Sequence, residues 1–74
     1  MAVAEYHVWV RRDPDEPWRY FGLRIVDVVG STATFGANFP KVDTALTGQI
    51  QDCSPDEPKL GAPNLCVQLS PGSQ

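Results

Sequence analysis

The sequence predicts a mainly β protein, folded as a small five-stranded antiparallel barrel or as a sandwich. Stretches in which apolar and polar residues alternate recur along the chain, as expected for strands with one buried face. The tetrapeptide Pro-Asp-Glu-Pro occurs at 14–17 and again at 55–58, each time between two such stretches. Proline fixes φ and lacks an N–H, so each copy is expected to be a stiff acidic connector between strands.

The first two strands are expected at Ala4–Val10 and Trp18–Val29. In the first, the even positions are apolar and should face inward, while odd positions such as Glu5 and His7 should face outward. The second is rich in β-branched and aromatic residues without a helical period, which favours a long strand with much of both faces covered. Gly30-Ser31 follows it, and glycine at the first central position is typical of a two-residue type II′ hairpin turn.

The third strand should run from Thr32 to about Phe39, with a bulge or bend at Gly36. Residues 40–53 are compatible with two structures, because their apolar residues recur at a helix-like spacing while Gly48 is a poor helix former. A strand is favoured, with a short helical turn near 40–44. As a strand, the segment would turn three residues inward: Leu46, Gly48 and Ile50.

Alternation resumes in Leu65–Leu69, which is the expected last strand. We therefore expect one small β domain over residues 1–69 and a flexible C-terminal tail over residues 70–74, whose composition is small and polar.

Length and charge restrict the classes of function. A chain of 74 residues buries only about 60% of its unfolded surface, so the core is marginal and self-association is expected, with the first strand as an unprotected sheet edge. The net charge of −3 argues against nucleic-acid binding, which depends on neutralising phosphates. No stretch approaches the roughly 18 apolar residues of a membrane span, and no membrane partner is expected. Residues 1–7 lack the features of a signal peptide, which predicts a cytoplasmic protein.

The cysteines and the only histidine do not form a recognisable metal motif. Cys53 and Cys66 flank the second connector, a spacing that allows a disulfide, but in a cytoplasmic protein two reduced thiols are expected. Without a CxxC pair or a second histidine beside His7, neither a metal site nor a cofactor is expected. The carboxylate pairs of the connectors should be solvated, so no catalytic residue is predicted.

The outward face of the first strand carries the candidate binding residues His7, Trp9 and Arg11. An aromatic ring lies there between polar or cationic neighbours, and Trp and Arg are enriched at binding hot spots. A second interpretation stays open, in which Trp9 packs within a barrel wall that is covered on both faces. Another aromatic group, expected mainly in the core, follows the first connector: Trp18, Tyr20 and Phe21.

Three short runs resemble parts of the plasmid-borne type II dihydrofolate reductases, in the same order: Ala33-Thr34-Phe35-Gly36, Gly48-Gln49-Ile50 and Val67-Gln68-Leu69. That family is similar in length and forms an SH3-like barrel, which assembles as a tetramer around a pore lined by a Val-Gln-Ile-Tyr run. The resemblance implies an SH3-like barrel here, with Lys41 as the candidate for the pore lysine. Ser70 stands where the family has its tyrosine, and the first two runs are spaced differently.

These observations predict a small non-enzymatic binding or assembly module that acts as a homo-oligomer through an aromatic-bearing β surface. Its expected partner is a second copy of itself, with another protein or a small ligand as alternatives. The resemblance supports a different function, a minimal oligomeric enzyme whose site forms at a symmetry axis. A module needs an exposed apolar patch, whereas such an enzyme needs a cleft with convergent polar groups.

Overall fold

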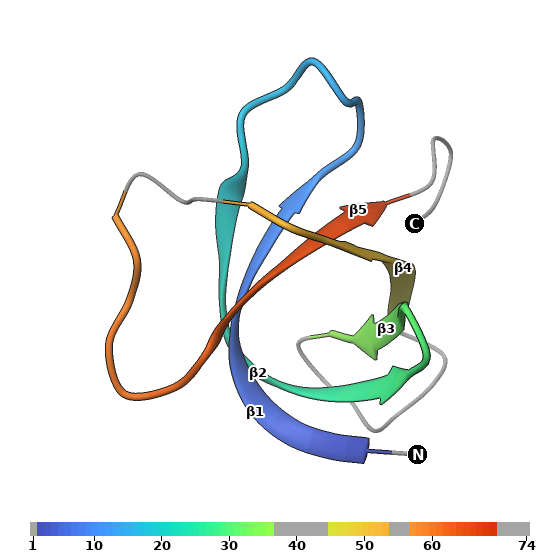
Figure 1. The fold of residues 1–74 in the computed structure, drawn as a ribbon, viewed down its shortest axis with the longest axis vertical. Coiled ribbons are helices and arrows are strands. Elements are labelled where there is room, and N and C mark those ends of the chain that lie inside the picture. The colour runs from blue at the N-terminus through green and yellow to red at the C-terminus, as the bar shows by residue number, and fades with distance from the viewer. Residues whose placement is uncertain (1, 37–44, 54–56, 70–74) are drawn as a thin grey trace.

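The computed structural model describes residues 2–36, 45–53 and 57–69, which form a closed barrel (Figure 1). The five strands are β1 (Ala2–Arg11), β2 (Arg19–Val29), β3 (Thr32–Phe35), β4 (Leu46–Gln51) and β5 (Asn64–Leu69). The predicted small β barrel is therefore confirmed. Within the described residues, no helix is long and apolar enough to cross a membrane.

The barrel closes by pairing its first strand with its last. Consecutive strands pair antiparallel, whereas β1 and β5 run parallel, with His7 opposite Asn64 and Arg11 opposite Gln68. The connector that leaves β1 and the connector that enters β5 therefore lie at opposite ends of this pair. The expectation that β1 is a sheet edge is wrong over His7–Arg11, which has a partner strand on each side.

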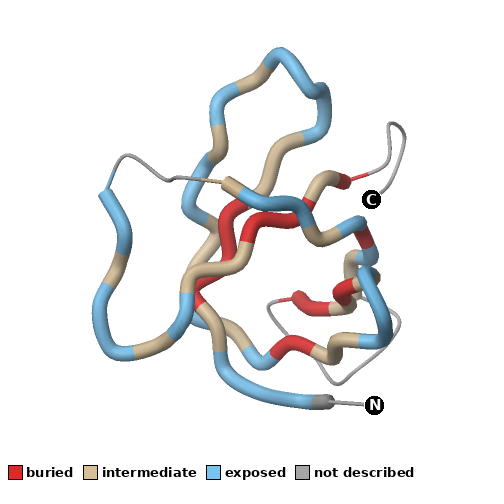
Figure 2. The backbone as a smooth tube through the Cα atoms, in the orientation of Figure 1, coloured by how far each residue is buried: buried red, intermediate tan, exposed pale blue. Residues whose placement is uncertain are grey.

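Residues from all five strands form the core of the barrel. The buried positions are marked in red along the backbone in Figure 2. The fully buried part of this core consists of Val8, Val26, Ala33, Phe35, Val67 and Leu69. Phe21 packs edge-on against Phe35 with ring centroids 5.2 Å apart. The outer side of β2 differs from the prediction, because Leu23, Ile25 and Val29 are 40%, 42% and 58% exposed. The expectation that much of both faces of β2 is covered is wrong.

Two glycines explain local geometry. Gly30 has φ +61°, and no non-glycine residue in the described part has a positive φ, so the two-residue turn between Val29 and Thr32 is of type II′, as predicted. Gly48 lies in β4 directly against β5. A Cβ added there would lie 2.6 Å from the carbonyl oxygen of Gln68, so the two strands can approach this closely only at glycine.

The ambiguous segment is a strand where the structure describes it. β4 turns Gly48 inward with Leu46 and Ile50 partly buried, and Gln49 is exposed, which confirms the strand prediction. β3 ends at Phe35, earlier than expected. Residues 37–39, the predicted helical turn near 40–44 and the predicted tail over 70–74 lie outside the described residues.

Candidate functional site

A β-bulge determines which aromatic side chains share the outer face of β1 and β2. Val8 is opposite Gly22, but Trp9 is opposite Tyr20, so β2 contains one extra residue at Phe21. Gly22 has φ +141°, a conformation that favours glycine. The bulge lets Phe21 pack into the core while Tyr20 joins Trp9 outside.

His7 lies on this outer face but is only 8% exposed. Its Nε2 lies 2.9 Å from the carbonyl oxygen of Leu60, which can only accept, so this nitrogen carries the proton. In the neutral imidazole, Nδ1 then accepts a hydrogen bond from the Tyr20 hydroxyl at 2.9 Å. Both ring nitrogens are therefore occupied by partners from the same chain, and His7 fastens the second connector to the barrel.

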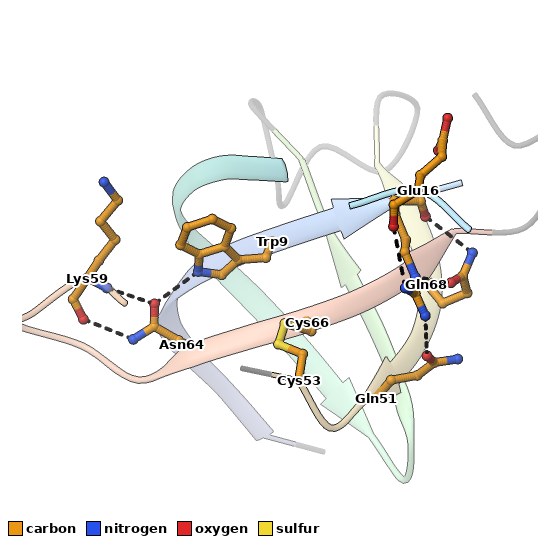
Figure 3. The surroundings of a disulfide bond; sticks show 9 residues. Trp9, Glu16, Gln51, Cys53, Lys59, Asn64, Cys66 and Gln68 are labelled. Atoms are coloured by element: carbon orange, nitrogen blue, oxygen red, sulfur yellow. Dashed lines mark hydrogen bonds between the residues drawn. A yellow bond between two sulfur atoms is a disulfide. The ribbon is translucent and has the colours of Figure 1, made fainter. Parts of the chain in front are cut away.

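Trp9 is 7% exposed and packs against the ring of Tyr20, with centroids 5.2 Å apart. Its Nε1 donates to Oδ1 of Asn64 at 2.9 Å, and the same amide receives the backbone N–H of Lys59 and donates to the Lys59 carbonyl (Figure 3). Asn64 thus links the indole to the second connector. At Trp9 the barrel wall is covered on both faces.

Arg11 is half-buried and held by several groups. Its Nε donates to Oε1 of Gln68 at 2.8 Å, and longer bonds of 3.4 Å reach the Glu16 carbonyl and Oε1 of Gln51. The guanidinium also lies 4.1 Å from the ring centroid of Trp18. Among the three predicted site residues, Arg11 is the most exposed, and its side chain is fixed in place.

Cys53 and Cys66 form a disulfide beside Trp9 (Figure 3), so the expectation of two reduced thiols is wrong. The antiparallel pairing of β4 and β5 places Gln51 opposite Cys66, which brings Cys53 within reach two residues later. The Cα atoms are 6.2 Å apart, within the usual range of about 4.4–6.8 Å. The bond closes the segment that covers His7 and Trp9.

Around the buried rings lies a set of exposed apolar side chains, here called the outer apolar surface. Its members are Val3 on β1, Tyr20, Leu23 and Ile25 on β2, and Leu60 on the second connector, between 40% and 92% exposed. The register places Leu23 opposite His7 and Ile25 opposite Glu5, so these side chains point to the same side of the sheet. Leu60 is the most exposed of them, although its carbonyl is bound by His7.

The two ends of this surface carry opposite charge. Asp27 is opposite Val3 and Ile25 is opposite Glu5, so both carboxylates lie towards the N-terminal end of β1. At the other end the ammonium of Lys59 lies 4.8 Å from the centroid of the Tyr20 ring. Glu5 and Trp9 are four residues apart, which separates the two ends by about 13 Å along the strand.

No protein family, curated protein or solved structure matches this chain. The resemblance to type II dihydrofolate reductases is therefore confined to the runs described above. In the third run, Gln68 lies on the outer face, where its Nε2 donates to the Arg12 carbonyl at 2.7 Å and its Oε1 accepts from Arg11. Lys41 and Ser70 lie outside the described residues.

The structure brings other side chains beside the predicted binding residues His7, Trp9 and Arg11. His7 and Trp9 are buried beneath the outer apolar surface. The exposed side chains that lie over them, Tyr20 and Leu60, were not predicted as site residues. A bulge cannot be placed from alternation alone, which is why Tyr20 was expected in the core. The described part contains no group of three or more His, Cys, Asp or Glu residues arranged to hold a metal ion.

Proposed function

We propose that this protein is a small non-enzymatic assembly module that forms a homodimer through the outer apolar surface. The observation that carries the proposal is the exposure of Val3, Ile25 and Leu60, at 56%, 42% and 92%, on one side of the barrel. Exposed apolar side chains gathered on one face are typical of protein–protein contact surfaces. Tyr20 supplies the aromatic component expected of such an interface.

The distribution of charge favours a second copy as the partner. A twofold axis in the plane of the interface and perpendicular to β1 reverses the second copy relative to the first. Lys59 of each protomer would then face Glu5 and Asp27 of the other, while Leu23, near the middle, would meet its own symmetry mate. The face is self-complementary in charge as well as apolar, which supports self-association over binding of an unrelated partner.

The disulfide supports an oxidising compartment as the place where the module acts, and not the cytoplasm expected from the sequence. Structural disulfides persist in secreted and periplasmic proteins and are rare where thiols are kept reduced. Alkylation of the protein during extraction, before any oxidation can occur, would label neither cysteine. Labelling of both cysteines would show that the thiols are reduced in the cell and would support a cytoplasmic location instead.

Sedimentation equilibrium of the full chain at concentrations from micromolar to millimolar tests the dimer. The wild type is expected to show a concentration-dependent mass approaching two chains. Ile25→Glu should raise the dissociation constant about tenfold to a hundredfold, because burial of such a side chain contributes roughly 1.5–3 kcal/mol. Thr47→Glu is the matched control, since it adds the same charge at an exposed position of β4, away from this surface.

A charge exchange tests the orientation of the two copies. Lys59→Glu should weaken the dimer, and adding Glu5→Lys in the same chain should restore it at low salt. A mass of one chain at the highest concentration would refute the proposal. Equal weakening by Ile25→Glu and Thr47→Glu would assign self-association to another surface, and failure of the double variant to recover would exclude the twofold arrangement.

A further inference from the structure

A second feature, separate from the outer apolar surface, is a pocket of about 280 Å³ at the end of the barrel where β1 and β5 finish. Its floor is apolar and is formed by core side chains at the ends of the strands: Val10, Phe21, Leu46 and Leu69. The volume is close to the lower limit of ligand pockets, about 300–1,000 Å³. The pocket therefore has room for a small molecule with an apolar body.

The rim of the pocket is cationic. Of the four arginines in the chain, three line it: Arg11, Arg12 and Arg19. Among the described residues of the lining, Glu16 is the single acidic one, so they carry a formal charge of three minus one, or +2, in a protein whose net charge is −3. This concentration of positive charge on an acidic molecule distinguishes the pocket from the rest of the described surface.

Arg11 supplies a guanidinium that is already positioned. Its hydrogen-bond acceptors are the side-chain amides of Gln68 and Gln51 and the backbone carbonyl of Glu16, all of them neutral. Stacking on Trp18 fixes the plane of the group further. The partners orient the charge without cancelling it, so little side-chain freedom remains to be lost when an anion binds.

Arg19 brings a second guanidinium to the same opening. It is opposite Val10 in the register, and Val10 belongs to the pocket floor, so both residues lie on the inner side of the strand pair. Arg19 is exposed, and its backbone is fixed in the sheet. Its cationic group can therefore reach an anion at the rim while the rest of the ligand lies on the apolar floor.

Glu16 is engaged by the connector and does not close the site. Its Oε1 accepts the backbone N–H groups of Arg12 and Asp13 at 3.1 and 3.2 Å. These two hydrogen bonds from backbone N–H groups are the main reason that the pKa of Glu16 is lowered. The positive charges of Arg19 and Arg12 contribute less. The carboxylate is thus partly satisfied by backbone donors, and the rim keeps its excess of positive charge.

We propose that this pocket binds a small amphiphilic anion, with a carboxylate or phosphate head group at the arginine rim and a short apolar body against Phe21 and Leu69. Charge-assisted bonds from guanidinium groups are the chemistry that recognises both head groups. The apolar floor adds a requirement that inorganic anions do not meet. The site is independent of the proposed dimer surface, which lies on the outer face of β1 and β2.

Amide chemical shifts of the labelled full chain, recorded during titration with four probes, test the proposal. Hexanoate and phenyl phosphate should shift signals from pocket residues and saturate at millimolar concentration, and the tighter of the two identifies the preferred head group. Hexanol lacks the charge and inorganic phosphate lacks the apolar body, so each should bind at least tenfold more weakly. Arg19→Gln should weaken the binding of the preferred anion about tenfold.

Lys59→Gln is the matched control: Lys59 lies on the second connector over the Tyr20 ring and is not among the residues that line the pocket, so removing its positive charge should change the affinity less than twofold. Equal weakening by Lys59→Gln and Arg19→Gln would show non-specific attraction and would overturn the assignment. If hexanol bound as tightly as hexanoate, the assignment would also be overturned, since the arginines would then have no role in binding. Absence of any saturable shift in folded wild-type protein would refute the pocket as a ligand site.

Discussion

The disulfide between Cys53 and Cys66 should supply a large part of the stability of this barrel. The two residues are 13 positions apart. Closing a loop of that length in the unfolded chain removes conformational entropy that corresponds to about 3 kcal/mol at 25 °C. A 74-residue domain has a free energy of unfolding of roughly 4–11 kcal/mol. Reduction of the disulfide is therefore expected to remove between a quarter and most of the free energy of unfolding.

Urea unfolding of the wild type with and without a reductant measures this contribution, with tryptophan fluorescence as the signal because Trp9 is buried next to Cys66 in the register. Reduction should lower the unfolding midpoint by about 2–3 M, given a slope near the lower end of about 1–3 kcal/mol per M. It should lower the melting temperature by about 12–24 °C. The variant Cys53→Ala/Cys66→Ala is the control and should not respond to the reductant. Identical wild-type midpoints under both conditions would refute the reasoning.

Two further predictions concern the connectors. Asn64→Ala should destabilise the protein by about 2–4 kcal/mol, because Trp9 Nε1 and both backbone groups of Lys59 lose their partner. The control is Gln51→Ala at an exposed position, which should change the free energy of unfolding by less than about 0.5 kcal/mol. Similar urea midpoints for the two variants would contradict the role of Asn64. Glu16 should titrate below an unfolded-peptide reference in carboxyl-carbon NMR, because backbone amides hold its pKa down. The stabilisation that Glu16 provides is then present above the unfolded pKa and is lost as the pH falls through the folded pKa. Glu16→Gln should abolish this pH dependence. A Glu16 titration midpoint equal to that of the unfolded-peptide reference would disprove the prediction.

Much of the fold follows from local sequence. Alternation, together with the β-branched and aromatic content of the second strand, indicated all five strands, and Gly30 located the type II′ turn, because these signals depend on backbone geometry within a few residues. In the sequence Gly48 counted only as a poor helix former, and the structure shows that it is the point where β4 touches β5. What alternation could not supply was the partner of each strand. The parallel closure of β1 on β5 is a contact between distant segments and leaves no local pattern.

The candidate site was predicted only in part for the same reason. His7, Trp9 and Arg11 were correctly placed on one face of β1, but whether that face is open depends on the second connector, which lies more than 50 positions away in the chain. Its path is set by Asn64 and by the disulfide, and neither the amide contacts nor the redox state of Cys53 can be derived from spacing. The pocket at the arginine rim is likewise formed by residues from four strands and a connector.

The pairing of the first strand with the last has a consequence for synthesis of the chain in the cell. Arg11 and Gln68 face each other across the closing seam, 57 residues apart. At elongation rates of roughly 5–20 residues per second, β1 leaves the ribosome about 3–11 s before β5 is complete. During that interval one flank of β1 has unpaired N–H and C=O groups, and it can pair with another nascent chain on the same polysome. Slower translation lengthens this interval, so the yield of correctly closed barrels should depend on elongation speed and on how closely ribosomes are spaced.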